Sequence, residues 1–436
     1  MGDFLNVSFY TLGCKVNQFE TEAMTQLFRD EAFEVIEPGK ASDVFVINSC
    51  TVTSASDKKT RNMISRFKRM NQDAIIVLAG CYAQSKQEDL KNEGNIDIII
   101  GTKYKDKVVE FVNEHIETKN MVFKVDEFNR DEIYENLTIT HTEERTRANI
   151  KIQDGCRQFC TYCIIPYVRG PVRSREIKDV LDEIIHLHQN GYKEIVLNGI
   201  HITSYGFDLT DTNLVRLIRE INTLNLEGVR FRLGSLEPRV ISEALIQEMI
   251  KGDFCDHFHL SLQSGSNSVL DRMNRRYTTE GYYDKVELIR RYMPDAGITT
   301  DVIVGFPGET EEEFEETCQF IEKVRFSKVH VFPFSPREGT KAFDMPDQIT
   351  GKIKKERTNR LIGLCNRVSQ DFYERFLDRT VDVLYEQRDE KGYYIGHATN
   401  YLTTHTYSDD DLHNARKHVR VSSIDSHTLI TEEVTL

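Results

Sequence analysis

Three cysteines stand close together in the segment DGCRQFCTYC: Cys156, Cys160 and Cys163, here called the loop cysteines. Their CxxxCxxC spacing allows three thiolates to bind three irons of one 4Fe–4S cubane, which normally takes four protein ligands. No fourth cysteine follows nearby, whereas structural zinc sites usually pair CxxC motifs to supply all four ligands. The spacing therefore favours a cluster with one open iron, at which a small molecule can bind and be cleaved. The alternative is a structural metal loop without chemistry.

A second set of three cysteines is spread over the first part of the chain. Cys14, Cys50 and Cys81, here called the strand-end cysteines, follow the apolar segments VSFYTL, DVFVINS and AIIVLAG. Each also precedes a polar loop and a predicted helix. Because the carboxyl ends of parallel strands lie along one edge of a sheet, these cysteines can converge in space. Free cysteines are often simply buried, but the repeated placement favours a second shared cluster.

The elements that must position these cysteines indicate an α/β protein in three parts. Residues 1–140 alternate apolar strands with helical patterns, which predicts a doubly wound parallel sheet. Residues 146–375 repeat strand and helix about six times, which predicts a partial (β/α)6 barrel with its chemistry at the carboxyl ends of the strands. Residues 376–436 carry short strand patterns typical of a small all-β, OB-like barrel, which either binds RNA or caps the fold.

The composition is that of a folded protein with several domains. The 436 residues are 39% hydrophobic and 29% charged, and the nine cysteines are too scattered for a secreted disulfide scaffold. Neither a signal peptide nor an apolar run of about 18 residues is evident. We therefore expect a cytoplasmic protein that does not enter membranes.

The net charge of −14 does not favour a nucleic-acid partner, but net charge can hide local patches. Basic residues gather at 58–69, 145–175 and 352–360. A single basic run is usually a solvated helix face, whereas several runs beside cysteine motifs favour a polyanionic partner. Arg145 and Arg147 either contact RNA phosphates or belong to a plain linker.

Together these motifs resemble the methylthiotransferase family of radical S-adenosylmethionine (SAM) enzymes over nearly the whole chain. The resemblance rests on TLGCKVNQFETE, NSCTVT, LAGCYAQ and KIQDGCRQFCTYCIIPYVRG, and a looser match in GYYIGHATNY indicates a C-terminal TRAM domain. It implies two 4Fe–4S clusters, one on the loop cysteines for SAM cleavage and one on the strand-end cysteines for the inserted sulfur. One SAM would donate a methyl group and another would be the radical source.

The resemblance and the strand ends together indicate residues that contact SAM. These candidates are Tyr162, Gly199, Ser235, Glu237, Gln263 and Gly305. Before the segment VIVGFPGE, Asp301 stands where a glycine is often found, and the glycines of this segment also fit a turn before a helix capped by TEEE. His201 is either a polar pocket group or a structural histidine. Cys255, Cys318 and Cys365 lack partners at ligand spacing, and we interpret Cys318 as a core residue of a helix.

Three branches of this family differ in substrate: isopentenyladenosine in tRNA, threonylcarbamoyladenosine (t6A) in tRNA, and an aspartate of a ribosomal protein. GCKVNQFETE and SCTVTSASDKKTR resemble the t6A branch, and Lys15 stands where we expect proline in the ribosomal branch. The resemblance therefore implies methylthiolation of C2 of t6A at position 37 of tRNA, with electrons from a donor such as a flavodoxin or ferredoxin. The other two substrates remain alternatives, as do sulfur insertion without methylation and a non-catalytic RNA-binding role.

Overall fold

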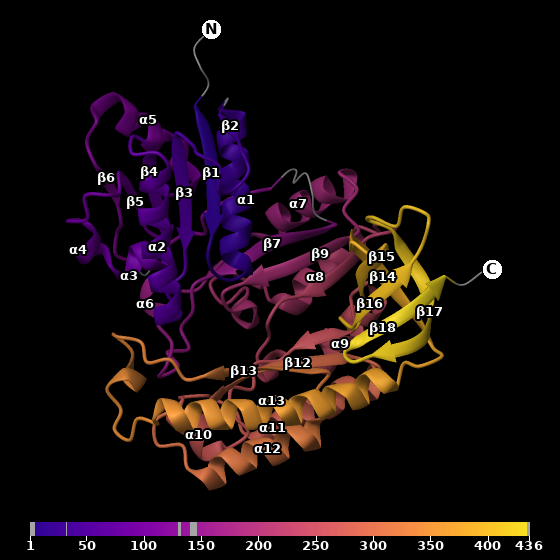
Figure 1. Ribbon diagram of the computed structural model, residues 1–436. Coiled ribbons are helices and arrows are strands. Elements are labelled where there is room, and N and C mark those ends of the chain that lie inside the picture. Colours follow the sequence, from indigo (N-terminus) through magenta and orange to yellow (C-terminus); the bar gives the residue numbers. More distant parts are fainter. Residues whose placement is uncertain (1–4, 32, 130–131, 140–145, 434–436) are drawn as a thin grey trace.

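The computed structural model describes residues 5–31, 33–129, 132–139 and 146–433. An N-terminal sheet and a C-terminal barrel lie on either side of a central, partly open barrel (Figure 1). The long helix α13 (Gly351–Glu374) leads from the central part into the C-terminal barrel. No helix in the described ranges is long and apolar enough to cross a membrane.

The N-terminal part is a six-stranded parallel sheet with helices on both faces, as predicted. Its elements are β1 (Asn6–Thr11), α1 (Lys15–Asp30), β2 (Glu34–Val35), β3 (Val44–Ser49), α2 (Ser54–Met70), β4 (Ile75–Gly80), α3 (Cys81–Ser85), α4 (Gln87–Leu90), β5 (Ile98–Ile100), η1 (Lys105–Lys107), α5 (Val108–Thr118) and β6 (Val122–Lys124). The strand order is β2-β1-β3-β4-β5-β6, so the direction of winding reverses beside β1. Helices α1 and α5 cover one face through Met24 and Val112, and α2 and α3 cover the other through Phe67 and Tyr82.

The central part contains the six parallel strands that the sequence predicted, and β8 adds a short antiparallel edge. Its strands are β7 (Arg147–Asp154), β8 (Arg173–Ser174), β9 (Glu194–Gly199), β10 (Arg230–Leu233), β11 (His257–His259), β12 (Gly297–Val304) and β13 (Lys328–Pro333). Its helices before α13 are α6 (Ile165–Arg169), α7 (Ile177–Gln189), η2 (Ile202–Ser204), α8 (Leu214–Thr223), η3 (Pro238–Val240), α9 (Glu243–Lys251), α10 (Asn267–Arg272), α11 (Thr279–Tyr292), α12 (Glu311–Val324) and η4 (Lys341–Phe343). Isolated bridges such as Leu236–Leu260 join the sheet of β7, β9 and β10 to that of β11–β13, so the strands form a partial barrel.

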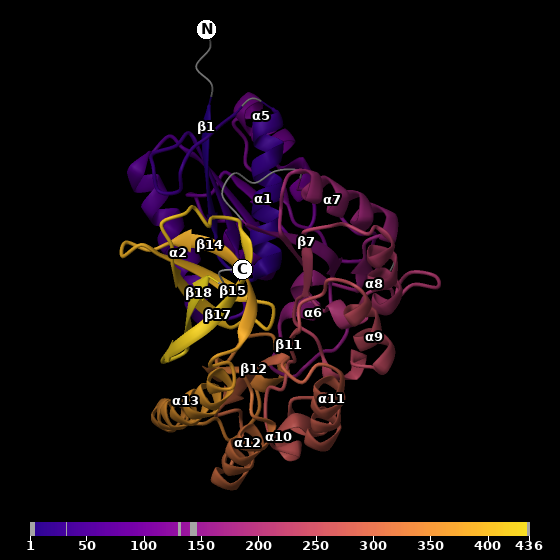
Figure 2. The same cartoon turned by 90° about the vertical axis from the view of Figure 1, so that its right-hand side faces the viewer.

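The interior of this barrel, its lumen, has a polar lining because side chains alternate along each strand. On β7, Ala148, Ile150 and Ile152 pack outward with α7, which leaves Asn149 and Lys151 on the opposite face. Helix α1 packs against β7 and β9, and Figure 2 shows it beside β7. The N-terminal part therefore covers one side of the lumen.

The C-terminal part is a closed five-stranded barrel in the order β14-β15-β16-β18-β17. Its strands are β14 (Thr380–Arg388), β15 (Tyr393–Ala398), β16 (Thr403–Tyr407), β17 (Arg416–Asp425) and β18 (Thr428–Glu433). Two buried arginines of β10 hold it: Arg230 donates to the His397 carbonyl (2.9 Å), and Arg232 donates to the Thr399 carbonyl (2.9 Å). Because Arg230 begins β10, the C-terminal barrel caps the end of the lumen at which the strands start.

Candidate active site

The loop cysteines lie just beyond the carboxyl end of β7, where the barrel prediction placed them. The Cys156 N–H donates to the Gly170 carbonyl (3.1 Å), which folds the loop back on itself. Gly155 begins the loop at φ +73°, and a Cβ there would lie 1.8 Å from the Pro171 carbonyl oxygen. Only glycine permits that approach, so the backbone fixes the position of the loop cysteines.

A buried ion pair lies beside the loop cysteines. Arg275 donates from Nη1 to Cys160 Sγ (3.2 Å) and pairs with Glu237 (3.0 Å). Burial alone would raise the pKa of Glu237, but hydrogen bonding to His201 and the charge of Arg275 hold it down to about 2. Arg275 Nη2 is buried without a hydrogen-bond partner among the described residues. This unused donor fits an additional acceptor, such as a cluster sulfide or a carboxylate of SAM.

The strand-end cysteines follow β1, β3 and β4, three neighbouring strands, and converge as predicted. A Cβ on Gly13 would lie 3.0 Å from Cys50 Cβ, so the first two segments touch. Arg169 donates from Nε to Cys81 Sγ (3.2 Å). Burial raises the pKa of Cys81 to about 12 although Arg169 opposes the shift. As a free thiol it holds its proton at neutral pH, and binding of iron would release that proton.

One short helix touches both sets of cysteines. Helix α6 follows the loop cysteines in the chain and packs against α3 of the N-terminal part. Cys81 packs with Ile164 and Val168 in an apolar cluster, and Thr102 Oγ1 donates to the Val168 carbonyl (2.8 Å). The two cysteine sites therefore share a wall.

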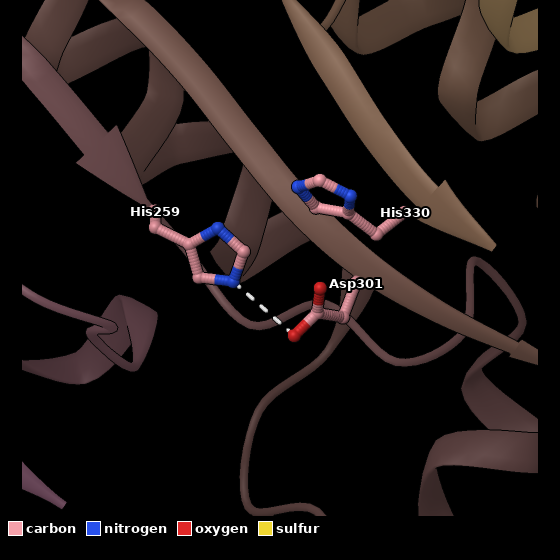
Figure 3. A group of neighbouring side chains, drawn as sticks. All are labelled: His259, Asp301 and His330. Carbon is pink, nitrogen blue, oxygen red and sulfur yellow. Dashed lines mark hydrogen bonds and ion pairs between the residues drawn. The ribbon is translucent and has the colours of Figure 1, made fainter. Parts of the chain in front are cut away.

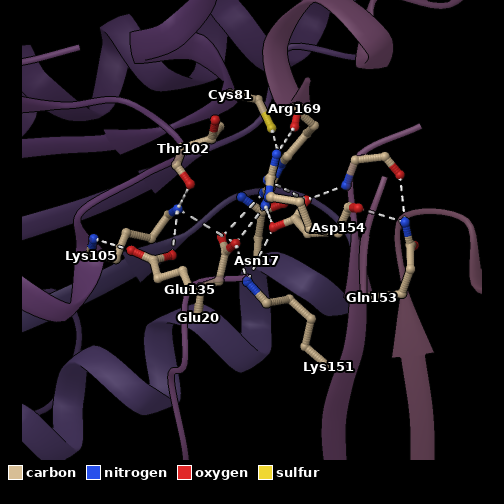
Figure 4. A network of polar contacts seen from close by, with 12 residues as sticks. Asn17, Glu20, Cys81, Thr102, Lys105, Glu135, Lys151, Gln153, Asp154 and Arg169 are labelled. Atoms are coloured by element: carbon tan, nitrogen blue, oxygen red, sulfur yellow. Dashed lines mark hydrogen bonds and ion pairs between the residues drawn. The ribbon is translucent and has the colours of Figure 1, made fainter. Parts of the chain in front are cut away.

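A buried network of charges joins the N-terminal part to the barrel around Arg169 (Figure 4). Arg169 pairs with Glu20 of α1 (2.5 Å) and with Asp154 of β7 (3.2 Å). Lys105 lies 3.5 Å from Glu20, and Lys151 lies 3.1 Å from Asp154. Burial would raise the pKa of Glu20, but these cations lower it to about 2. Since breaking such a pair strands a buried charge, the network fixes the relative position of the two cysteine sites.

The spacing of the sulfur atoms argues against single metal ions. Three thiolates on one tetrahedral zinc lie about 3.8 Å apart, because each Zn–S bond is about 2.3 Å long. Within the described ranges, no three cysteine sulfurs lie within 4.8 Å of one another. A cubane has no such requirement, because each thiolate binds a different iron.

A cavity of about 930 Å³ opens between the N-terminal part and the loop cysteines. Its lining includes Gln84 of α3, which lies one turn after Cys81, and Cys156 itself. Two exposed aromatic rings, Phe159 and Tyr167, stand at the cavity with their centroids 5.6 Å apart. A ligand in this cavity would therefore meet the walls of both cysteine sites and two rings on which a base can stack.

The other residues predicted to contact SAM lie near the carboxyl ends of the barrel strands. Gly199 ends β9, Gln263 forms a bridge with Val302, and Gly305 follows β12 at φ +71°. Ser235 is exposed beyond β10. Tyr162 packs partly against the apolar cluster around Phe306 and Phe334. Their contacts with SAM, like that of Glu237, stay predictions.

Three predictions about structural residues are confirmed. Thr310 caps α12 and forms a capping box with Glu313. Cys318 is buried with Phe314 and Ile321 on the inner face of the same helix. Cys255 and Cys365 are buried as well and lie outside both cysteine sets.

Most of the basic run at 145–175 is not an open surface for a polyanion, although Arg157 is exposed and lines the large cavity. Four of its cations are buried in internal ion pairs: Lys151, Arg169, Arg173 and Arg175. Arg147 pairs with Glu386 (2.6 Å), and Arg145 lies outside the described residues. By contrast, the run at 58–69 lies on α2 with most of its cations exposed. Net charge along the sequence could not distinguish these cases, because the acidic partners come from distant segments.

Sequence reasoning also missed a polar layer inside the barrel. His259, Asp301 and His330 come from the adjacent strands β11, β12 and β13, with one ligand atom of each within 4.8 Å of the others (Figure 3). His259 Nε2 lies 3.2 Å from Asp301 Oδ2, and burial lowers the pKa of His330. The sequence signal for this layer was the spacing of His257 and His259, which lie two residues apart on one strand and therefore share a face. Such a layer can hydrogen-bond a polar ligand that enters the lumen.

Comparisons with known proteins agree with this arrangement. Residues 150–321 match the Radical SAM superfamily, and residues 6–101 match the family described as "Uncharacterized protein family UPF0004". The superfamily implies one 4Fe–4S cluster and SAM, and the loop cysteines fit that cluster. The solved structure of TsrM, a radical SAM methyltransferase of Kitasatospora setae with cobalamin and a 4Fe–4S cluster bound, superposes with a TM-score of 0.59. That likeness covers 78% of this chain and 74% of TsrM at 14% identity, so it concerns the fold alone.

Curated relatives resemble the chain much more closely. It is 40% identical over 402 residues to "Threonylcarbamoyladenosine tRNA methylthiotransferase MtaB" of Bacillus subtilis, covering 91% of this chain and 89% of that protein. The protein of the same name from Aquifex aeolicus is 38% identical, over 85% of this chain and 90% of its own length. "tRNA-2-methylthio-N(6)-dimethylallyladenosine synthase" of Acetivibrio thermocellus is 37% identical, over 86% and 79%. The chain therefore belongs to the methylthiotransferase family of radical SAM proteins.

Proposed function

We propose that this protein attaches a methylthio group to C2 of t6A at position 37 of tRNA. Two relatives that match it at 40% and 38% identity carry the t6A name, while others carry the dimethylallyladenosine name at 37% or less. The sequence features of the first part, GCKVNQFETE and SCTVTSASDKKTR, favour the same branch. The alternatives are isopentenyladenosine in tRNA and a ribosomal-protein aspartate.

The observation that carries this proposal is the wall shared by the two cysteine sites. Methylthiolation requires one substrate carbon to meet both a radical source and a sulfur donor. Helix α6 touches the strand-end cysteines through Val168 and Arg169 and follows the loop cysteines directly. Two structural metal loops would not need a common cavity of about 930 Å³.

The two cysteine sets would divide the work. We assign one 4Fe–4S cluster to the loop cysteines and a second to the strand-end cysteines. When bound, the first cluster and SAM supply radical chemistry, which can replace the unreactive C2–H of adenine. Tyr162, Gly199, Ser235, Glu237, Gln263 and Gly305 would hold SAM at the strand ends. Arg275 and Arg169 each donate a hydrogen bond from a positively charged guanidinium to a cysteine sulfur. These positive charges would offset the negative charge of a thiolate-bound cluster.

The RNA would approach from the side of the large cavity. Phe159 and Tyr167 are 45% and 51% exposed there, and stacking of a base on an aromatic ring is worth about 1–3 kcal/mol. The exposed cations of α2 offer contacts to phosphates. The C-terminal barrel would act as the TRAM domain. We expect the reaction in the cytoplasm, with electrons from a flavodoxin or ferredoxin.

Mass spectrometry of nucleosides from total tRNA, with and without this gene, tests the proposal. We expect methylthio-t6A to disappear and t6A to accumulate in the strain without the gene. Loss of the isopentenyl derivative instead would replace the substrate and keep the chemistry. If no tRNA nucleoside changed, the tRNA assignment would be wrong, and the ribosomal proteins would be measured next.

A further inference from the structure

A second cavity, of about 410 Å³, lies where the three parts of the protein meet. It is far larger than the space of one water molecule, about 30 Å³. It is lined by Lys15 and Gln18 of α1, by Thr146, Arg147, Asn149 and Val196 of the central part, and by Glu386, Gln387 and Tyr401 of the C-terminal barrel. We call this cavity the junction pocket.

Tyr401 enters the junction pocket in a fixed and strained position. It adopts φ +70° in the turn between β15 and β16, a backbone conformation that bulky residues seldom take. Its ring stacks with both His257 and His397, with centroids 4.7 Å and 4.8 Å away, and Arg232 lies 4.8 Å from its centroid. Strain of this kind persists where the surroundings enforce it and is common at ligand sites.

The carboxylates around the junction pocket are already paired with arginines. Glu386 binds Arg147 (2.6 Å), and Glu194 binds Arg230 (2.7 Å) and Arg232 (2.8 Å). Asp382 binds Arg416 (2.6 Å).

Lys15 differs from these cations, because no ion pair or hydrogen bond of its Nζ occurs within the described ranges. Its side chain lines the pocket and is exposed there. A cation that lines a pocket and has no partner in the protein favours an anionic ligand, which can form a charge-assisted hydrogen bond with it.

The neighbouring phenol reports the same positive potential. Burial would raise the pKa of Tyr401, but Arg147, Lys15 and Arg232 lower it below its ordinary value. The positive side chains around the pocket therefore stabilise a negative charge placed there.

The junction pocket also begins next to the proposed sulfur site, because Lys15 directly follows Cys14 in the chain. In adenine, C2 and the carbon that bears N6 are separated by a single ring nitrogen. A base whose C2 faces the strand-end cysteines therefore carries its N6 substituent only a short distance away. The substituent of t6A ends in a carboxylate, whereas an isopentenyl group carries no charge.

We infer that the junction pocket binds the threonyl carboxylate of t6A through Lys15, with Arg147 and Tyr401 beside it. This inference rests on the proposed function and adds the residue that selects the substrate within it. An isopentenyl group in the pocket would exclude water from Lys15 without offering it a partner, and binding sites reject analogues that leave polar groups unpaired. The C-terminal barrel then contributes to specificity by supplying Tyr401.

Two anticodon stem-loop RNAs test this inference. They are identical except that one carries t6A and the other carries its threoninamide analogue, which lacks only the negative charge. A charge-assisted hydrogen bond is worth about 1.5–3 kcal/mol, so we expect the wild-type enzyme to prefer the t6A RNA at least about tenfold in kcat/KM. Lys15→Met should bring this ratio close to one, and Lys15→Arg should retain most of it. The exposed residue Lys178 of α7 provides the matched control, Lys178→Met.

The ratio of the two rates is independent of cluster loading, because one enzyme preparation meets both RNAs. Binding of each RNA measured by fluorescence anisotropy, without SAM or reductant, gives a second readout that needs no chemistry. Equal use of both RNAs by the wild-type enzyme, or an unchanged ratio in Lys15→Met, would overturn the inference and leave the proposed function standing. Modification of an isopentenyladenosine RNA instead of either RNA would overturn both. The wild-type ratio alone can overturn the inference even if the variant does not fold.

Discussion

The two cysteine sites use the same local arrangement on different scaffolds. At the strand-end site, Arg169 donates to Cys81 Sγ at 3.2 Å, and at the loop site, Arg275 donates to Cys160 Sγ at 3.2 Å. One site takes its ligands from three strands, whereas the other takes them from a single loop. The arginine–thiol contact therefore does not depend on one scaffold, and it would suit the thiolate-bound cluster that we propose at each site.

The arginines differ in what surrounds them. Arg169 is fully buried, and its guanidinium is bonded to Glu20 and Asp154 as well as to Cys81. Arg275 pairs with Glu237, but its Nη2 has no hydrogen-bond partner in the described part of the chain. The first arginine joins two parts of the protein, while the second retains a donor for a ligand.

The largest expected effect comes from removing a cysteine of each set. Cys160→Ala should abolish formation of 5′-deoxyadenosine from SAM by the reduced protein, because the loop site would lose an iron ligand. Cys50→Ala should keep some SAM cleavage and lose methylthiolation of tRNA. Chromatography of both products measures the two activities together.

The buried cysteine Cys318 supplies the control for this pair, since Cys318→Ala should retain both activities. Normal methylthiolation by Cys50→Ala would contradict the assignment of a second cluster to the strand-end cysteines.

Arg169→Met should destabilise the protein strongly. Removing one partner of a buried ion pair leaves the other charge uncompensated, which costs about 3–5 kcal/mol. Arg275→Met should cost less, because Glu237 keeps Arg239 at 2.6 Å and His201 at 3.5 Å. Urea unfolding of the cluster-free proteins measures both losses.

The double variant Glu20→Gln/Arg169→Met sharpens this measurement, because it removes the stranded carboxylate. It should recover part of the stability that Arg169→Met loses. No recovery would mean that Arg169 acts through packing and not through its charge.

Low pH should destabilise the folded protein, because Glu20 becomes protonated. Its pKa is held at about 2, below the ordinary value of 4.5, by the cations around it. A depressed pKa contributes stability that is fully present above pH 4.5 and is lost as the pH falls toward 2. Thermal unfolding between pH 7 and pH 3 should therefore show a smaller loss for Glu20→Gln than for the wild type. Equal losses would show that Glu20 is not tied to the network.

Local signals sufficed to predict the loop site and the order of the parts. A ligand spacing within eight residues needs no knowledge of the fold, and apolar strands alternate clearly with amphipathic helices such as α7. The strand-end cysteines could be predicted because each follows a strand of the same sheet. The edge strands β2 and β6, two and three residues long, were missed because they are too short to show a period.

Long-range pairings could not be predicted in the same way. Arg169 looks like one cation of a basic run, and only the fold brings Glu20, 149 positions away, against it. Arg275 likewise meets Cys160 across 115 positions. Nothing in the local sequence distinguishes such buried arginines from exposed ones, because their burial depends on acidic partners from other elements.

The smallest expected effect is that of Arg239→Ala, which tests whether an arginine at the loop site must be buried or only close to Glu237. Arg239 and Arg275 both pair with Glu237, at 2.6 Å and 3.0 Å, but the Arg239 side chain is 38% exposed and that of Arg275 only 6%. Solvent screens the exposed pair, so Arg239→Ala should change the free energy of unfolding by less than about 1 kcal/mol. It should also leave SAM cleavage well above that of Arg275→Met, since Arg239 makes no contact with a cysteine sulfur among the described residues. Equal losses in the two variants would mean that the charge near Glu237 matters and the contact with Cys160 does not. The similarity between the two cysteine sites would then be one of geometry without a common role.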